Sequence, residues 1–177
     1  MPTFTQGIDV ANELSKELIA ADFGPFYATP CGILSPLHRT LDELVGVLTV
    51  AREDNAVGIA VGASLTGRNP VVLMENAGLG LSLSAIASLV VPYKIPMLFV
   101  VDVRVATDEQ PGAALPGESV ILRKLTVPLL VGLGVETFEL EPDTPLAEQV
   151  NLIRESVQDQ RRPAALLIAS DTSGLPR

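Results

Sequence analysis

Short runs of apolar residues alternate along the chain with stretches in which apolar residues recur every three or four positions. A continuous apolar run of four to eight residues is typical of a strand that is buried on both faces, whereas the longer spacing is typical of an amphipathic helix. The expected strands cover residues 25–29, 47–51, 71–74, 97–101, 135–140 and 164–169. The expected helices cover residues 9–24, 55–66, 81–91 and 118–130, and two more begin at Ser35 and at Thr144.

Six strands that alternate with six helices predict an α/β fold, with a doubly wound, mostly parallel sheet and helices on both faces. We expect residues 1–177 to form one domain, in which the end from about residue 170 is a flexible tail. In such a sheet the crevices that bind ligands lie at the carboxyl edge, where each strand passes into the next helix.

Composition narrows the class of partner. The formal net charge of −9 disfavours nucleic acid and anionic membranes, because both select for Lys and Arg. The most apolar segment, residues 79–101, is interrupted by Pro92 and Pro96, so we do not expect it to span a membrane. The single cysteine, Cys31, and the lack of a signal-peptide pattern at the start both favour the cytoplasm. Apolar residues make up 47% of the chain, which favours a surface that a partner covers.

The sequence argues against several catalytic chemistries. With one histidine, His38, and one cysteine, the chain cannot form a zinc site of the usual kind. His38 lies within the amphipathic pattern of the second helix, which argues against Ser–His–Asp catalysis. No P-loop motif occurs, and Gly78-Leu79-Gly80 lacks the third glycine of a dinucleotide fingerprint. A glycine turn before the helix at 81–91 could still bind an anion or the edge of a ring through its backbone N–H groups.

Two places at the expected carboxyl edge remain as candidates. Glu53 follows the strand at 47–51, which we expect to be buried, and precedes a helix of small residues that could pack closely on the sheet or on a partner helix. Glu75–Gly80 follows the strand at 71–74 and is expected to be a loop whose glycines let a ligand approach the backbone. From spacing alone, the simpler interpretation of Glu53 is a helix-start carboxylate that accepts hydrogen bonds from amide groups.

The sequence around these two places resembles a known family. Residues 52–63 and 70–80 together are similar to the pyrimidine-binding (PYR) domain of thiamine-diphosphate enzymes, and most of all to the sulfopyruvate and phosphonopyruvate decarboxylase group. Further similar segments are the first active-site loop (29–37), the fourth strand with the arginine after it (95–98 and Arg104) and a motif of the long loop (115–117). The resemblance covers roughly residues 5–170.

The resemblance implies a thiamine-diphosphate-binding fold of PYR type and a catalytic role for Glu53. In the family a buried glutamate bonds the N1′ nitrogen of the aminopyrimidine ring and so activates the cofactor, which removes CO₂ from a 2-oxo acid. The implied activity is that of a thiamine-diphosphate-dependent 2-oxo acid decarboxylase, a carbon–carbon lyase. The implied cofactor-binding residues are Glu53, Pro30, Cys31, Asn76, Gly78, Leu79 and Gly80, and the implied substrate-binding residues are Asn76 and Arg104.

Three of these residues also have a simpler interpretation. Cys31 could be a small apolar filler, and Asn76 could hold a turn through its side chain. Arg104 could pair with Asp102 or Asp108 instead of binding the anionic end of a substrate.

The resemblance also implies a second polypeptide. In the family, diphosphate and Mg²⁺ are held by Gly-Asp-Gly followed by an asparagine, on a separate pyrophosphate-binding (PP) domain. No Gly-Asp-Gly occurs in the 177 residues, so we expect the Mg²⁺ ligands on a partner chain and none in this one. The expected assembly is a hetero-oligomer with a PP-domain subunit, and the cofactor lies between the two chains.

Several residues depart from the family pattern. Glu75, Ala77 and Leu81 replace a glutamine, a serine and an asparagine, and Val103-Arg104-Val105 replaces Trp-Arg-Gly. A histidine of the long loop is missing, and Ser170-Asp171 stands where a basic residue is usual. Fewer donors and more negative charge fit a sulfonate or phosphonate tail poorly. We therefore expect the substrate to be a different or larger 2-oxo acid, or the reaction to be a carboligation with an aldehyde. The alternative to an enzyme subunit is a scaffold domain that binds no cofactor, but a scaffold would not need Glu53.

Overall fold

The computed structural model describes residues 4–103, 117–141 and 143–169. Within them one sheet contains the strands β1 (Phe26–Ala28), β2 (Val47–Thr49), β3 (Val71–Glu75), β4 (Met97–Val103), β5 (Glu136–Glu139) and β6 (Pro163–Ala169). The helices are α1 (Phe4–Ala20), α2 (Ser35–Val45), α3 (Glu53–Leu65), α4 (Asn76–Ala85), α5 (Gly117–Leu133) and α6 (Leu146–Arg154). Two π-helical turns, η1 (Ile86–Val90) and η2 (Glu155–Asp159), continue α4 and α6.

The strands lie in the order β2-β1-β3-β4-β6-β5, and all five neighbouring pairs in the described sheet are parallel. The predicted doubly wound α/β fold is therefore confirmed. The chain passes from β1 to β2 on one side and then to β3 on the other side of β1, so the strand order reverses next to β1. Such a reversal is where open α/β sheets bind their ligands.

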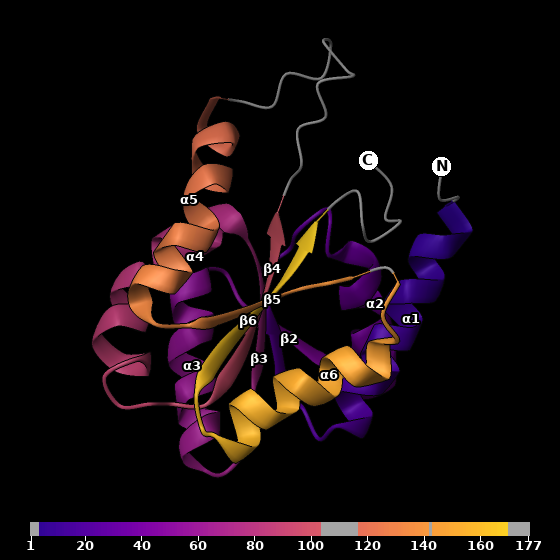
Figure 1. Cartoon of the computed structure of the whole chain (residues 1–177), viewed down its shortest axis with the longest axis horizontal. Helices are drawn as coiled ribbons and strands as arrows, with labels where there is room; N and C mark the ends of the chain where they lie inside the picture. The colour runs from indigo at the N-terminus through magenta and orange to yellow at the C-terminus, as the bar shows by residue number, and fades with distance from the viewer. Residues whose placement is uncertain (1–3, 104–116, 142, 170–177) are drawn as a thin grey trace.

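Helices cover both faces of the sheet. Figure 1 shows α3, α4 and α5 on one side and α1, α2 and α6 on the other. Successive strand residues point to opposite faces, and β4 follows this rule: Leu98 and Val100 pack with the α1–α2–α6 layer, whereas Phe99 and Val101 pack with the α3–α4–α5 layer. Burial on both faces explains why the central strands read as continuous apolar runs.

Two expectations about the carboxyl edge are wrong. The segment after Glu75 is not a loop, because β3 passes directly into α4 at Asn76 and the glycines lie in the first turns of that helix. The strand β2 is not buried: it lies at the edge of the sheet, pairs with β1 alone, and has half-buried to exposed residues. The apolar residues of this edge strand give the same sequence pattern as those of a central strand, which is why the sequence predicted it to be buried. No helix among the described residues is long and apolar enough to cross a membrane.

Candidate active site at the carboxyl edge of the sheet

Three segments that follow neighbouring strands bring Glu53 into contact with Thr29 and Gly78. Glu53 is the first residue of α3, after β2, and Thr29 directly follows β1. The Glu53 Oε1 accepts a hydrogen bond of 3.0 Å from the Thr29 hydroxyl, which is itself buried. One carboxylate oxygen of the half-buried Glu53 is therefore held in place.

Gly78 is needed for the position of Glu53. A Cβ atom built on Gly78 would lie 2.6 Å from the Glu53 Cδ and 2.8 Å from its Oε1. Carbon atoms in ordinary contact are about 3.5–4.0 Å apart, so no side chain fits at position 78 while Glu53 stays where it is. We expected the glycines of this segment to let a ligand approach the backbone; in the structure the Glu53 side chain approaches Gly78.

The neighbouring charged residues pair with each other, which leaves one carboxylate oxygen of Glu53 without a hydrogen bond among the described residues. Arg52 forms an exposed ion pair with Asp54, with 2.9 Å between Nη2 and Oδ2. Their hydrogen bond raises the pKa of Arg52 and lowers the pKa of Asp54. Among the described residues the side chain of Glu53 makes one hydrogen bond, through Oε1. Its Oε2 can therefore meet a proton on a bound ring.

Asn76 brings a buried amide to the same edge. It is the first residue of α4, two positions before Gly78, and only 6% of its surface is exposed. Within the described part of the chain its side-chain Nδ2 has no hydrogen-bond partner. Leaving a buried donor unpaired costs about 1–3 kcal/mol, so such a group in a native protein needs an explanation, of which a role in catalysis or in binding an ion or water is one.

Asp102 is a residue of this edge that the sequence did not reveal. It lies in β4, is completely buried, and accepts hydrogen bonds from the Asn76 backbone N–H (2.9 Å) and from the Cys31 thiol (3.4 Å). Burial, and secondarily the charge of Asp102, raises the pKa of Cys31 to about 12, so the thiol stays protonated and can donate. The available signal was an acidic residue directly after the apolar run of the strand expected at 97–101.

Cys31, Glu75 and Asp102 each place one donor atom within 4.8 Å of the others. A protonated thiol is a poor metal ligand, and both oxygens of Asp102 already accept hydrogen bonds. We therefore assign this cluster to holding the backbone. Cys31 also packs against the core of the α1–α2–α6 layer, in agreement with its simpler interpretation.

The remaining predicted residues fall in different environments. Leu79 is 1% exposed and belongs to the core of the α3–α4–α5 layer, so its side chain is structural. Gly80 is half-buried within α4, and Pro30 is exposed in the loop after β1. Arg104, which we expected to bind substrate, lies outside the described residues, as do Pro116 and the tail from residue 170.

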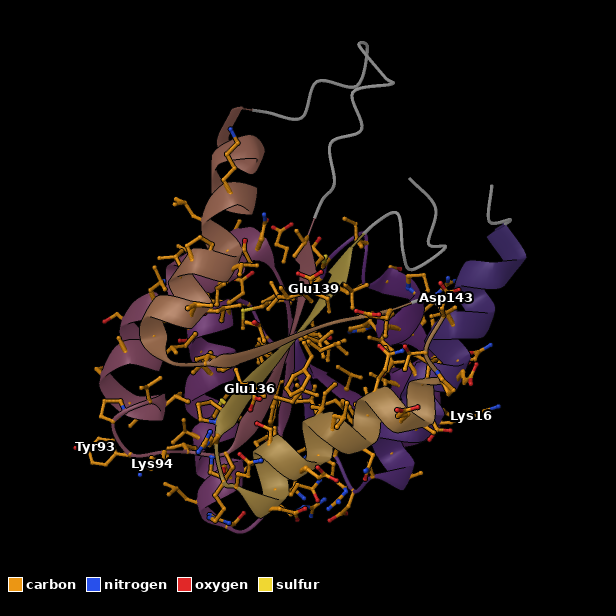
Figure 2. The ribbon with its side chains drawn as sticks, viewed as in Figure 1. Lys16, Tyr93, Lys94, Glu136, Glu139 and Asp143 are labelled. Atoms are coloured by element: carbon orange, nitrogen blue, oxygen red, sulfur yellow. The ribbon has the colours of Figure 1, made fainter. Side chains whose placement is uncertain are left out.

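A surface pocket lies at the other end of the molecule. Leu65, Tyr93, Lys94 and Arg161 line it, next to the turns that lead into β4 and β6. Figure 2 shows Tyr93 and Lys94 far from the ends to which the arrows of β4 and β6 point. This pocket is separate from the Glu53 edge.

No family model matches the chain, but known proteins do. The chain is 33% identical to the sulfopyruvate decarboxylase subunit alpha of Methanococcus maripaludis, over 80% of this chain and 83% of that protein. It is 36% identical to the same subunit of Methanocaldococcus jannaschii, over 50% of this chain and 54% of that protein. The match to the phosphonopyruvate decarboxylase of Streptomyces hygroscopicus, at 29% identity, spans 78% of this chain but only 34% of that longer protein.

Among solved structures, the 2-oxoglutarate:ferredoxin oxidoreductase of Magnetococcus marinus has a similar fold. The TM-score is 0.67, and the match covers 95% of this chain and 31% of the other. The sequences are only 12% identical, so the likeness concerns the fold alone.

Proposed function

The chain belongs to the family of sulfopyruvate decarboxylase alpha subunits, and on that premise we propose that it is the PYR-domain subunit of a split, thiamine-diphosphate-dependent 2-oxo acid decarboxylase. Its active site would be completed by a separate PP-domain subunit. Residues 1–177 would then act as one PYR-type domain.

The observation that carries the proposal is the placement of Glu53. The carboxylate lies at the ligand-binding edge of the sheet, with Oε1 held by Thr29 and with its stem against Gly78. The role proposed for it is to hold or share a proton at Oε2 with a ring nitrogen of the cofactor. A proton partner fixed in this way contributes roughly 10²–10⁴-fold to a rate. A scaffold domain has no need of a carboxylate held in this manner.

The residues at the edge fit the proposed cofactor. The unpaired Nδ2 of Asn76 could donate to an acceptor on the cofactor or on the substrate. Pro30 and Cys31, in the loop after β1, and the first turns of α4 would form the walls next to it. When bound, thiamine diphosphate supplies the nucleophilic carbon and the electron sink for the loss of CO₂. In this proposal the chain itself orients the ring and holds its proton, and Mg²⁺ would be held by the partner chain.

Two findings support a partner chain. The matching proteins of Methanococcus maripaludis and Methanocaldococcus jannaschii are named subunit alpha. The longer phosphonopyruvate decarboxylase extends well beyond the matched third of its length, which fits a second domain on the same polypeptide.

An uncharged surface offers a place for this partner to bind. No ionisable residue occurs from Asn55 to Gly67 or from Asn76 to Val91, which cover α3 after its first two residues and the whole of α4. These helices lie side by side and begin at the Glu53 edge. The α3–α4 surface exposes glycine and large apolar side chains: Gly58, Ile59, Gly62, Leu65, Leu81 and Leu89. Exposed apolar area of this kind is typical of an interface, and it starts where the partner would have to reach the cofactor.

Co-expression with a chain that carries Gly-Asp-Gly and the following asparagine tests the proposal. The complex should bind thiamine diphosphate with Mg²⁺ and release CO₂ from a 2-oxo acid. Glu53→Gln should lower turnover by roughly 10²–10⁴-fold and leave the complex assembled. The matched control is Asp54→Asn, which changes the neighbouring half-buried acid and should keep parent activity. Parent activity in Glu53→Gln, or decarboxylation by this chain without a partner, contradicts the proposal.

The substituted residues of the edge favour a second candidate, a carboligase or acyl-transferring lyase that uses the same cofactor. The side chains of Ala77 and Leu81 cannot donate hydrogen bonds, and Leu81 is 59% exposed. A sulfonate or phosphonate tail needs several donors. Comparing CO₂ release from pyruvate, sulfopyruvate, phosphonopyruvate and branched 2-oxo acids, with and without an aldehyde acceptor, separates the candidates. Strong preference for sulfopyruvate or phosphonopyruvate rejects the carboligase.

A further inference from the structure

Asp102 connects two segments of the candidate site to the middle of the sheet. Its side chain is completely buried, and each carboxylate oxygen accepts a hydrogen bond from a different segment. The Oδ1 accepts from the backbone N–H of Asn76 at 2.9 Å, at the start of α4. The Oδ2 accepts from the Cys31 thiol at 3.4 Å, in the loop after β1.

The bond to Asn76 supplies an acceptor that the start of α4 needs. The first N–H groups of a helix have no partner within the helix. The N-cap residue of α4, Glu75, makes no side-chain capping bond. Asp102 provides the acceptor from the neighbouring strand, where it lies in register with Glu75. The placement of Asn76 and of Gly78, two residues later, therefore depends on Asp102.

We propose that Asp102 is a positioning residue of the candidate active site. It fixes the first turn of α4 so that the Asn76 amide is presented at the ligand-binding edge and Gly78 lies against Glu53. With none of its surface exposed, Asp102 acts through Asn76 and not by contact with a ligand. This inference rests on the proposed function, because Asn76 and Glu53 are the groups that it places.

A carboxylate suits this task and its amide does not. Asparagine has one acceptor oxygen and one NH₂ donor. At position 102 its NH₂ group would face either the Asn76 N–H, which cannot accept, or the Cys31 sulfur, which is only a weak acceptor. Losing one buried hydrogen bond corresponds to about tenfold in an equilibrium constant. Asp102→Asn therefore loosens one of the two connections without emptying the space.

Hydrogen exchange on the full chain tests this without cofactor or partner. In Asp102→Asn the amides of Asn76 and Ala77 should exchange about tenfold faster, because the first turn of α4 opens more often. The matched control is Ser64→Ala, which removes a buried hydrogen bond of 2.7 Å to the Pro96 carbonyl at the opposite end of the sheet. In that variant exchange at the start of α4 should not change. Equal exchange at Asn76 in both variants overturns the proposal.

A second variant keeps the test decisive if Asp102→Asn does not fold. Cys31→Ala removes the other hydrogen bond of Asp102 and leaves the Asn76 bond in place. The Asp102 carboxylate is then less restrained and should hold the Asn76 N–H less firmly, so the Asn76 amide should exchange faster. Parent-like exchange in Cys31→Ala counts against the proposal.

Kinetics of the complex separate positioning from simple stabilisation. Asp102→Asn should raise the KM for thiamine diphosphate by about tenfold, whereas Ser64→Ala should keep the parent KM. If Asp102 contributed to stability alone, both variants would contain less active enzyme but would keep the parent KM. That result would contradict the proposal that Asp102 positions the site. If the parent complex neither binds thiamine diphosphate nor releases CO₂, the proposed function fails, while the exchange data still decide whether Asp102 holds α4.

Discussion

Replacing Gly78 by alanine should remove activity while leaving most of the stability. The added Cβ would lie 2.6 Å from the Glu53 Cδ, so the carboxylate has to retreat by about 1 Å to reach ordinary contact. Crowding of this kind destabilises by about 1–3 kcal/mol. Gly78 lies within α4, where alanine is favoured over glycine by about 1 kcal/mol. The net loss of stability is therefore about 0–2 kcal/mol.

The effect on turnover should be larger. A misplacement of about 1 Å can lower a rate by roughly 10²-fold, which corresponds to about 2.7 kcal/mol in the activation free energy. Steady-state CO₂ release by the complex measures this loss, and urea unfolding of the chain measures stability. Gly132→Ala is the control, since it makes the same change in α5 where nothing lies within 4 Å of the new methyl group.

Parent-like turnover in Gly78→Ala would refute the reasoning about Glu53. The reasoning would also be refuted if Gly78→Ala lost turnover only because the protein unfolds at the assay temperature. Gly132→Ala should keep activity and gain about 0.5–1 kcal/mol of stability.

Other changes test the remaining contacts. Thr29→Val keeps the shape but removes the hydrogen bond to Glu53, and should lower kcat about tenfold in steady-state assays; unchanged kcat would show that Oε1 needs no partner. Gly62→Arg should bury a charge where the partner binds the α3–α4 surface, so the two chains should elute separately in size-exclusion chromatography. The control Leu152→Arg, on the exposed side of α6 in the opposite layer, should leave the complex intact. Because the pKa of Cys31 is raised to about 12, iodoacetamide should alkylate it slowly at pH 8 and faster as the pH approaches 12; a midpoint near 9 would contradict its burial beside Asp102.

The sequence predicted the strands and helices well because their patterns are local. The run around Phe99 is apolar at every position, and the structure buries it on both faces. The same reasoning failed for Val47–Thr49, since the pattern does not tell whether a second strand lies alongside. It failed again after Glu75, where glycines and an asparagine read as a loop. The backbone N–H at the start of α4 finds its hydrogen-bond acceptor on a different strand, in the side chain of Asp102 on β4.

The candidate site shows the same limit. Glu53 could be found because it follows a strand and because the surrounding residues resemble a family. Its partners could not, since Thr29 and Gly78 meet it only through the order of β1, β2 and β3 in the sheet. Asp102 lies just beyond the strand expected at 97–101, and only the register of β3 with β4 reveals its contact with Asn76.

The close approach of position 78 to position 53 has an evolutionary consequence. Two sites separated by a whole helix and strand cannot vary independently: a lineage that acquires any β-carbon at 78 must either displace the acid at 53 or replace it. Glycine at 78 in an unfamiliar homologue would then serve as a marker of a working carboxylate, and its loss as a sign that the descendant has turned to another task.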